Sequence, residues 1–194
     1  MAKLTQEQLK ERLVGLGVMI NDPEFVENLK DWAKGMRTNP SMTRDGSLPA
    51  VGDITSIDAH YQIMMMTAIY GRIGKGWTYN VDYIYASDYV AAEVTVQIYD
   101  KEKKEWGLPY GPVGRIESLH SPKGGFDKEC AKKAMTNALT KALSHTGLNA
   151  DVFLGMFDCD AYVKDNEKRH NDIDKLAKDS PTNKENVNES GNAQ

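Results

Sequence analysis

The chain has 194 residues, of which 40% are hydrophobic, and its formal net charge at pH 7 is −4. This length suits one domain with additional segments, and the sequence has no apolar run of about 18 residues that would predict a membrane span. The opening stretch MAKLTQEQLKERL predicts a polar helix and not a signal peptide. Cys130 and Cys159 are too few for a disulfide scaffold, and the four histidines lack zinc-ligand spacing with them. We therefore expect a cytoplasmic protein without a metal or cofactor. The net charge argues mildly against nucleic-acid binding, unless the chain carries a local basic stripe.

Helical patterns open the chain, over residues 5–20 and 23–35. Residues 36–54 are rich in turn formers and predict a loop. A third helix is expected over residues 57–70. The residues that could cap its N-terminus are Asp53 and Ser56.

Alternation of apolar and polar residues then predicts β-strands over residues 77–86, 90–100 and 108–118. Residues 101–107, KEKKEWG, are expected to form a charged hairpin tip, and prolines interrupt the third strand. The expected unit is a three-stranded antiparallel β-meander with one face covered by a helix.

The strongest helical pattern spans residues 127–147, with Asp127 as its expected cap and Gly147 as its expected stop. Residues 148–163 form an apolar and acidic end piece, and residues 164–194 have the polar composition of a disordered tail. The predicted fold class is α+β: an antiparallel three-stranded β-meander packed with a long helix, preceded by N-terminal helices and followed by the tail. The expected divisions are N-terminal helices and loop, core, and tail, at residues 1–54, 55–163 and 164–194.

A glycine-rich turn, YGRIGKGW, joins the predicted third helix to the first predicted strand. A phosphate-binding P-loop has a longer spacing between its first glycine and its Gly-Lys pair, and it leads from a strand into a helix. Here only two residues separate Gly71 from Gly74, and the order of elements is reversed, so the pattern disfavours nucleotide binding. A helix stop followed by a turn explains the glycines, but it does not require the cations Arg72 and Lys75.

The predicted helix over 127–147 is basic and polar on one side and small and apolar on the other. Spacing by four residues defines two polar stripes: Lys128, Lys132 and Thr136 on one, and Lys133, Asn137, Thr140 and Lys141 on or beside the other. Lysines at such spacing support sequence-independent, salt-sensitive binding of phosphates. A solvated amphipathic face is the alternative, and this pattern by itself favours the alternative.

Aromatic residues follow the glycine turn: Trp77, Tyr79, Tyr83 and Tyr85. Cations beside aromatic rings suit a single nucleic-acid strand, whose bases stack while its phosphates are neutralised. The alternative is a half-buried strand face, which we expect to account for at least half of these rings.

A metal-dependent nuclease is a further alternative, because Asp151, Asp158 and Asp160 lie close together in the sequence and two-metal nucleases use such carboxylates. No second acidic cluster accompanies them in a known motif, and aspartates at turns and helix caps are common. The sequence therefore predicts neither a catalytic residue nor a metal ligand.

Taken together, the segments IDAHYQIMMMTAIYGRIGKGW, YVAAEVTVQIYD and FDKECAKKAMTNALTKALSHTGLNADVFLGMFDCDAYV resemble single-strand annealing proteins of the "Rad fifty-two" type, in their bacteriophage form. The likeness covers residues 55–163 and is most specific in KKAMTNALTKALSHTGLNADVFLG. It implies a β-β-β-α core whose protomers assemble into rings or open arcs, with single-stranded DNA in a basic groove. The implied activity is annealing of complementary strands without ATP, in DNA recombination and repair.

The resemblance also implies which residues contact DNA. The groove would be lined by Lys132, Lys133, Thr136 and Lys141, with Lys128 on the same helix and Lys123 contacting a second strand. Eukaryotic members carry a basic pair where this chain has Thr140-Lys141, and arginines where Ser144 and Tyr61 stand, so the resemblance also implies that Tyr61 contacts DNA in the groove. We therefore expect weaker, more salt-sensitive binding, or compensation by the cations Arg72, Lys75 and Arg115.

The expected partners are single-stranded DNA, further copies of the chain, and a host or phage single-stranded-DNA-binding protein, with no membrane. If the chain is phage-encoded, its location is the host cytoplasm. An oligomeric interaction protein, whose tail recruits a single-stranded-DNA-binding or replication factor, is the main alternative. The metal-dependent nuclease is the less favoured one.

Overall fold

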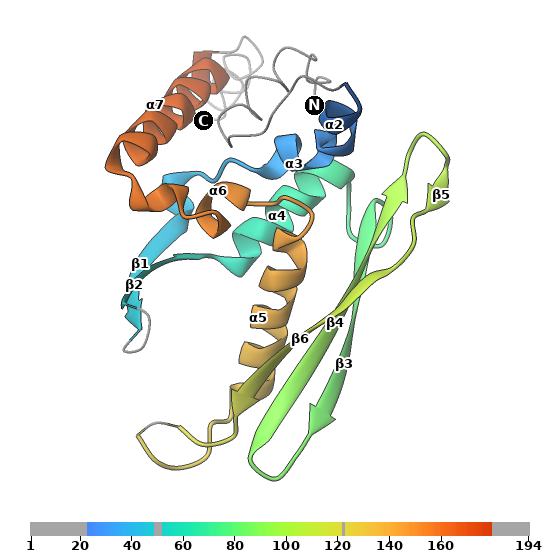
Figure 1. Cartoon of the computed structure of the whole chain (residues 1–194), viewed down its shortest axis with the longest axis vertical. Helices are drawn as coiled ribbons and strands as arrows, with labels where there is room; N and C mark the ends of the chain where they lie inside the picture. Colours follow the sequence, from blue (N-terminus) through green and yellow to red (C-terminus); the bar gives the residue numbers. More distant parts are fainter. Residues whose placement is uncertain (1–22, 49–51, 122, 180–194) are drawn as a thin grey trace, which may run out of the picture.

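The computed structural model describes residues 23–48, 52–121 and 123–179. Figure 1 shows most of the helices gathered at one end of the molecule, while a long twisted sheet and helix α5 extend toward the other end. Within the described residues the strands form one antiparallel sheet of four strands and one of two. The predicted α+β class with antiparallel sheets is therefore confirmed. Among the described helices, none is long and apolar enough to cross a bilayer.

The N-terminal part consists of short elements. They are α2 (Pro23–Asn28), α3 (Lys30–Gly35), the 3-10 helix η1 (Pro40–Met42), β1 (Thr43–Leu48) and β2 (Gly52–Ile57). The single helix predicted over 23–35 is thus divided at Leu29. The helix predicted over 5–20 lies outside the described residues.

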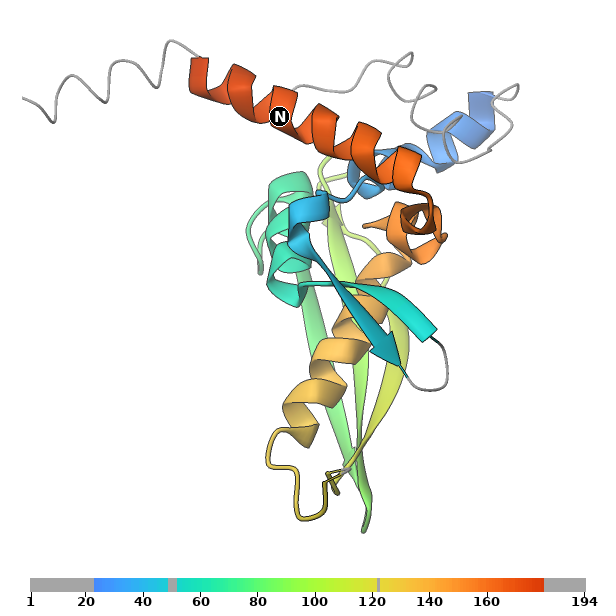
Figure 2. The same cartoon turned by 90° about the vertical axis from the view of Figure 1, so that its left-hand side faces the viewer.

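The loop predicted over residues 36–54 is wrong, because this segment contains η1, β1 and the start of β2. The Asn39 side chain accepts a hydrogen bond from Ser41 N at 3.0 Å, and Pro40 occupies the first helical position, so a short turn of helix forms. β1 and β2 then pair from Thr43 opposite Ile57 onward. β-branched residues favour strands, and those of this hairpin, mainly in β2, outweigh the turn formers in the same segment. Figures 1 and 2 show the hairpin projecting from the body of the molecule.

Helix α4 (Ala59–Tyr70) is capped by Asp58, not by Asp53 or Ser56 as predicted. The Asp58 carboxylate accepts a hydrogen bond from His60 N at 2.8 Å, which satisfies one of the free N–H groups of the first turn. The helix ends at Gly71, whose φ of 114° is readily adopted only by glycine.

The four-stranded sheet contains β3 (Trp77–Tyr85), β4 (Tyr89–Asp100), β5 (Glu105–Trp106) and β6 (Tyr110–Ser118). Three strands were predicted; the additional one, β5, lies in the segment assigned to the hairpin tip. β5 and β6 both pair with β4, so they are successive pieces of one returning segment. Pro109 and Pro112 interrupt this segment because proline lacks the N–H that a ladder hydrogen bond requires.

Helix α5 (Cys130–Ser144) packs against β4 and β6 and is shorter than the predicted 127–147. Its buried residues follow the helical repeat and are mainly alanine and leucine, so the helix lies close to the sheet. On β4 they meet a row of alternate buried residues, Val90, Ala92, Val94 and Val96. The Asp127 carboxylate accepts a hydrogen bond from Glu129 N in the turn before the helix.

The C-terminal part consists of α6 (Ala150–Phe153), the 3-10 helix η2 (Met156–Asp158) and α7 (Asp160–Asp179). The disorder predicted from residue 164 is therefore wrong as far as Asp179, and residues 180–194 lie outside the described residues. Asn166 of α7 is 1% exposed and donates a hydrogen bond to Thr38 O at 2.6 Å. Composition failed here because α7 packs against the N-terminal part of the chain, which supplies the burial that an isolated polar segment lacks.

Candidate functional site

The glycine turn between α4 and β3 is explained by close packing of the backbone. A Cβ atom on Gly76 would lie 2.2 Å from Tyr70 O, and Gly76 N donates a hydrogen bond to Arg72 O at 2.8 Å. The turn leads from a helix into a strand, as predicted, which is the reverse of a P-loop. The side chains of Arg72 and Lys75 are exposed on it.

The structure places this turn far from the start of α5. The turn precedes Trp77, whereas Asn137 of α5 donates a hydrogen bond to Glu117, which lies level with Tyr85 at the other end of β3. The two ends of β3 are about 27 Å apart at the usual rise per strand residue. Arg72 and Lys75 therefore do not join the predicted lysines at the N-terminal end of α5 in one compact site.

The lysines at the N-terminal end of α5 are engaged with carboxylates of the chain itself. Lys132 Nζ lies 2.9 Å from a Glu129 oxygen, and Lys133 Nζ lies 2.6 Å from an Asp127 oxygen. The hydrogen bond from Lys133 holds the pKa of the Asp127 carboxyl below its usual range and raises the pKa of Lys133 in turn. All of these groups reach solvent, so a phosphate can compete for the two ammonium groups.

Helical geometry separates the predicted lysines onto two sides of α5. Lys141 follows Lys132 by about two and a half helical turns, so their side chains leave opposite sides of the helix. Lys133, Asn137 and Lys141 share the side that faces β6, as the hydrogen bond from Asn137 to Glu117 at 2.7 Å shows. Thr136 is half-buried and lies on the side of Lys132.

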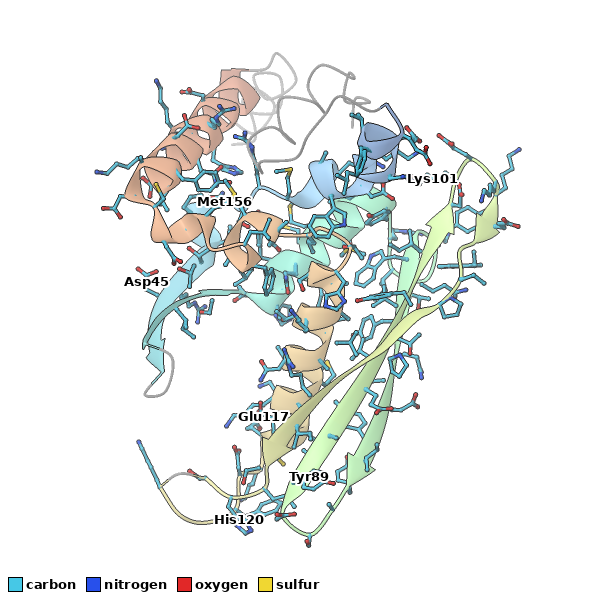
Figure 3. All side chains as sticks on the ribbon, viewed as in Figure 1. Asp45, Tyr89, Lys101, Glu117, His120 and Met156 are labelled. Atoms are coloured by element: carbon cyan, nitrogen blue, oxygen red, sulfur yellow. The ribbon has the colours of Figure 1, made fainter. Side chains whose placement is uncertain are left out.

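Strand β6 contributes a cation to the same side. Arg115 pairs with Ala92 and Glu117 pairs with Val90, and both partners on β4 belong to the buried row beneath α5. By this register Arg115 belongs to the sheet face that carries α5, and at the edge of the sheet it also borders a hollow beside Gly114 and Ile116. We name the surface formed by Lys133, Asn137, Lys141 and Arg115 the β6 flank. Glu117, labelled in Figure 3 near the N-terminal end of α5, is the carboxylate within it.

The β6 flank leads to a hollow of about 370 Å³ at the C-terminal end of α5. Its lining comes from α3, α5, α6 and their connections: Trp32, Lys141, Ser144, His145, Ala150, Phe153 and Leu154. Lys141 Nζ lies over the Phe153 ring, 5.6 Å from its centroid. We name this hollow the α5–α6 pocket.

Two further predicted cations, Lys123 and Lys128, are exposed in the segment that precedes α5. Glycines with positive φ, Gly124 and Gly125, shape this segment, and Gly124 N donates a hydrogen bond to Ser121 O at 2.9 Å. The segment lies at the same end of the molecule as Glu117 and His120, which Figure 3 labels. Lys123 and Lys128 are thus near the start of the β6 flank, whereas the α5–α6 pocket is at its other end.

Tyr61, predicted to stand in the DNA groove, is only 7% exposed. Its hydroxyl accepts a hydrogen bond from Asn39 N at 3.2 Å, and burial raises its pKa. The residue thus supports the chain before η1, and little of its surface is available to a ligand in the described structure.

The aspartates of the nuclease alternative are not gathered into a site. Asp151 is fully buried and accepts hydrogen bonds from Thr38 N, Thr38 Oγ1, Tyr162 Oη and Val152 N, whereas Asp158 and Asp160 are exposed. Across the described ranges, no group of three or more His, Cys, Asp or Glu residues is placed to hold a metal ion. Asp151 therefore has a structural role.

No protein-family model matches the chain, and no curated protein is found that matches it.

Sequence reasoning missed the α5–α6 pocket and the carboxylate of Glu117 beside α5. Glu129 stands three residues before Lys132, so that pairing was visible as a helical neighbour. Glu117 reaches α5 only through the pairing of β6 with β4, which no local pattern reveals. Trp32 and Phe153, which both line the pocket, are distant in the sequence. The sequence marks the place where they meet through Gly147, a position that requires glycine because a Cβ there would lie 2.3 Å from the Trp32 ring.

Proposed function

We propose that this chain binds single-stranded DNA without reading its sequence and promotes the pairing of complementary strands without ATP. The observation that carries the proposal is the β6 flank, where Lys133, Asn137 and Lys141 follow one another at steps of about 6 Å along the helix axis. Arg115 adds a fourth polar group from the neighbouring strand. A regular row of cations and amides suits a repeating phosphate backbone, which positions a strand without specifying its bases.

We further propose that β3, β4 and the β5–β6 segment, with α5 on one face, form the β-β-β-α unit that the resemblance implies. Within the described residues β4 is the one strand that pairs with β3, and Trp77 O accepts a hydrogen bond from Gly74 N at 2.7 Å. Beyond Trp77, over residues 78–85, the other edge of β3 offers N–H and C=O groups for pairing. Such an edge is suited to pair with a second copy of the chain. Because β3 and β6 lie on opposite sides of β4, pairing of the β3 edge of one copy with the β6 edge of the next would repeat the β6 flank from copy to copy along a track for DNA.

Annealing requires that the repulsion between two phosphate backbones be reduced while the bases stay available. A lysine that exchanges a carboxylate of the chain for a phosphate gains little Coulomb energy, because both are anions at similar distance. Lys133 makes such an exchange with Asp127, and Glu117 remains beside the bound strand. Binding by each protomer is therefore weak and salt-sensitive, which favours release of the paired product.

The decisive experiment measures the annealing of two complementary dye-labelled oligonucleotides without ATP and without magnesium, at low and moderate salt. The unmodified chain should accelerate annealing, and the acceleration should fall as salt rises. Replacing both Lys133 and Lys141 by glutamine should remove most of it. In equilibrium binding, the loss of two contacts should lower the slope of log affinity against log salt by about 1.4, at about 0.7 per phosphate contact.

The matched control replaces Lys101 and Lys103, which removes the same charge near the β4–β5 turn. Figure 3 shows Lys101 at the end of the sheet away from Glu117. These two substitutions should leave annealing close to that of the unmodified chain. If both pairs of substitutions slow annealing equally, net charge and not the β6 flank determines the activity. If the folded, unmodified chain does not accelerate annealing, the proposed function is rejected.

One observation favours the alternative of an interaction protein. The sheet face opposite α5 carries exposed apolar side chains, Ile84 and Ile116, beside a hollow of about 620 Å³. Exposed apolar patches mark protein contacts more often than nucleic-acid contacts. Under this alternative, capture of a single-stranded-DNA-binding or replication factor would be lost on deleting residues 180–194 and would survive the Lys133 and Lys141 substitutions.

A further inference from the structure

The α5–α6 pocket is held open by a close approach of backbone and ring. Gly147, with φ of 85°, lies against Trp32, and any Cβ at this position would meet Trp32 atoms at 2.3–2.7 Å. Leu148 and Asn149, which follow, are buried, so the connection from α5 to α6 is fixed. The aromatic side chains of α3 and α6 are therefore brought to one hollow by the fold and not by chance exposure of a loop.

The pocket presents aromatic surface to solvent. Phe153 is 43% exposed and Leu154 is 58% exposed, although both are large apolar side chains. One face of the Phe153 ring is covered by the Lys141 ammonium, which is attracted by the negative face of the ring. Among the described residues the Lys141 ammonium is the one cation over this ring, and the ring can receive another flat group once the half-buried lysine side chain extends into solvent.

The charges around the pocket define what can enter it. Among the described residues that line it, none carries a carboxylate, and its one permanent cation, Lys141, stands in the last turn of α5. The C-terminal end of a helix carries partial negative charge, so an anion deep in the pocket is disfavoured. The fitting occupant is a neutral, flat, apolar-faced group that is tethered to an anion at the lysine. The volume of about 370 Å³ is sufficient for one such ring system.

We propose that the α5–α6 pocket binds an unpaired nucleobase of single-stranded DNA. The base stacks on Phe153 beside Trp32, while Lys141 leaves the ring and contacts the adjoining phosphate. This inference rests on the proposed function, because it makes the pocket the end of the phosphate track on the β6 flank. It adds to the sequence-independent phosphate contacts a contact that requires a base but accepts any of the four, since each base has an aromatic face.

The test compares two oligonucleotides of equal length, one of thymidines and one of abasic units, binding to the full chain across a range of salt. Phe153→Ala should weaken binding of the thymidine strand about tenfold, which lies within the usual effect of removing one stacked base. Binding of the abasic strand should not change, and the salt slope should stay the same for both. Lys141→Gln should instead lower the salt slope for both strands by about 0.7.

Further variants separate the base from other occupants and from misfolding. Phe153→Leu keeps an apolar side chain of similar size and should lose affinity as Phe153→Ala does, whereas a pocket for apolar side chains of a protein partner would tolerate leucine. Phe153→Trp should retain binding. Phe25→Ala removes another exposed phenylalanine, 56% exposed in α2, and should have no effect.

The outcomes distinguish the two proposals. If the chain binds thymidine and abasic strands equally well, and Phe153→Leu binds as the unmodified chain does, the pocket is not a base site while the proposed function stands. If the folded chain binds neither strand, both proposals are overturned. Selective loss of thymidine binding in Phe153→Ala and Phe153→Leu, with an unchanged salt slope, establishes the base site.

Discussion

The contact between α5 and the sheet is built from apolar side chains, whereas the junction of η1, α6 and α7 is built from polar ones. Under α5, Ala138 and Ala142 meet Val94 and Val96 of β4, and all four are at most 1% exposed. At the junction, buried groups such as Asp151 and Asn166 are joined to Thr38 by hydrogen bonds. Both regions exclude solvent, but one does so without directional bonds and the other through them.

The difference bears on how the candidate site is held. Apolar packing sets how closely α5 lies on the sheet and tolerates small shifts, because the hydrophobic effect is not directional. Hydrogen bonds at the junction fix where α6 stands, and α6 carries Phe153 into the α5–α6 pocket. Within the part of the chain that the structure describes, the buried oxygens Asn149 Oδ1 and Asn166 Oδ1 have no hydrogen-bond partner, so this junction is less stabilising than its number of bonds suggests.

The largest effect is expected in the apolar region, from Trp77→Ala. Trp77 is fully buried at the start of β3, and its Nε1 donates a hydrogen bond to Thr67 Oγ1 at 3.4 Å. Truncating a buried tryptophan lowers the free energy of unfolding by about 3–5 kcal/mol. Urea denaturation followed by circular dichroism measures the change.

The control for this prediction is Trp106→Ala on β5, where the side chain is 39% exposed. It should cost less than about 1.5 kcal/mol, because much of its surface is in water in the folded state. If the two substitutions cost the same, the sheet beneath α5 is not the main source of stability, and the comparison between the two regions fails.

A smaller effect is expected at the polar junction, from Asp151→Asn. The asparagine has one acceptor oxygen for four donors, so about two hydrogen bonds to a buried group are lost, worth about 2–3 kcal/mol in total. Asp158→Asn, at an exposed position nearby, should leave the free energy of unfolding within about 0.5 kcal/mol of the unmodified value. A metal-dependent nuclease, by contrast, would lose magnesium-dependent cleavage on both substitutions.

The pH dependence of this effect has a definite sign. Burial raises the pKa of Asp151 above that of an exposed carboxyl, although its hydrogen bonds oppose the shift. Between the two values the folded chain holds a proton that the unfolded chain has lost, so the contribution of Asp151 declines as pH rises from about 4 through the raised pKa. The stability difference between the unmodified chain and Asp151→Asn should therefore be larger at pH 4 than at pH 7. A difference that grows toward pH 7 would contradict a raised pKa.

The same contrast explains what the sequence could predict. The apolar region follows local periodicity: alternation marked β3, β4 and β6, and the helical repeat marked α5, because burial of one face produces those patterns. The polar junction depends on contacts between residues more than 100 positions apart, such as Thr38 with Asp151, and polar composition made α7 resemble a disordered segment. Its order arises from packing that no local window contains.

In the candidate site, too, local patterns predicted some features, whereas others depend on contacts between distant segments. The lysines of α5 were predicted from their spacing, and the structure shows Lys132 and Lys133 exposed on that helix and Lys141 half-buried. Helical geometry separates these lysines onto two sides of α5. The pairing of β6 with β4 brings the Glu117 carboxylate beside the helix. Tyr61 was misplaced because its assignment came from a position in a resemblance, whereas its burial depends on the chain before η1.

The smallest effect, and the finest test of the comparison, is expected from Tyr162→Phe. The substitution keeps the ring, which meets Phe157 edge to face at 6.0 Å, and removes only the hydroxyl that donates to Asp151 at 2.9 Å. One of four bonds is lost, so the free energy of unfolding should fall by about 1 kcal/mol. Losing this donor should also raise the pKa of Asp151 further, so the decline in stability should extend to higher pH than in the unmodified chain. Tyr85→Phe, at a 68% exposed position, should change neither quantity. If Tyr162→Phe behaves like Tyr85→Phe, the hydrogen bonds of the junction do not hold α7, and its position must come from apolar contacts like those under α5.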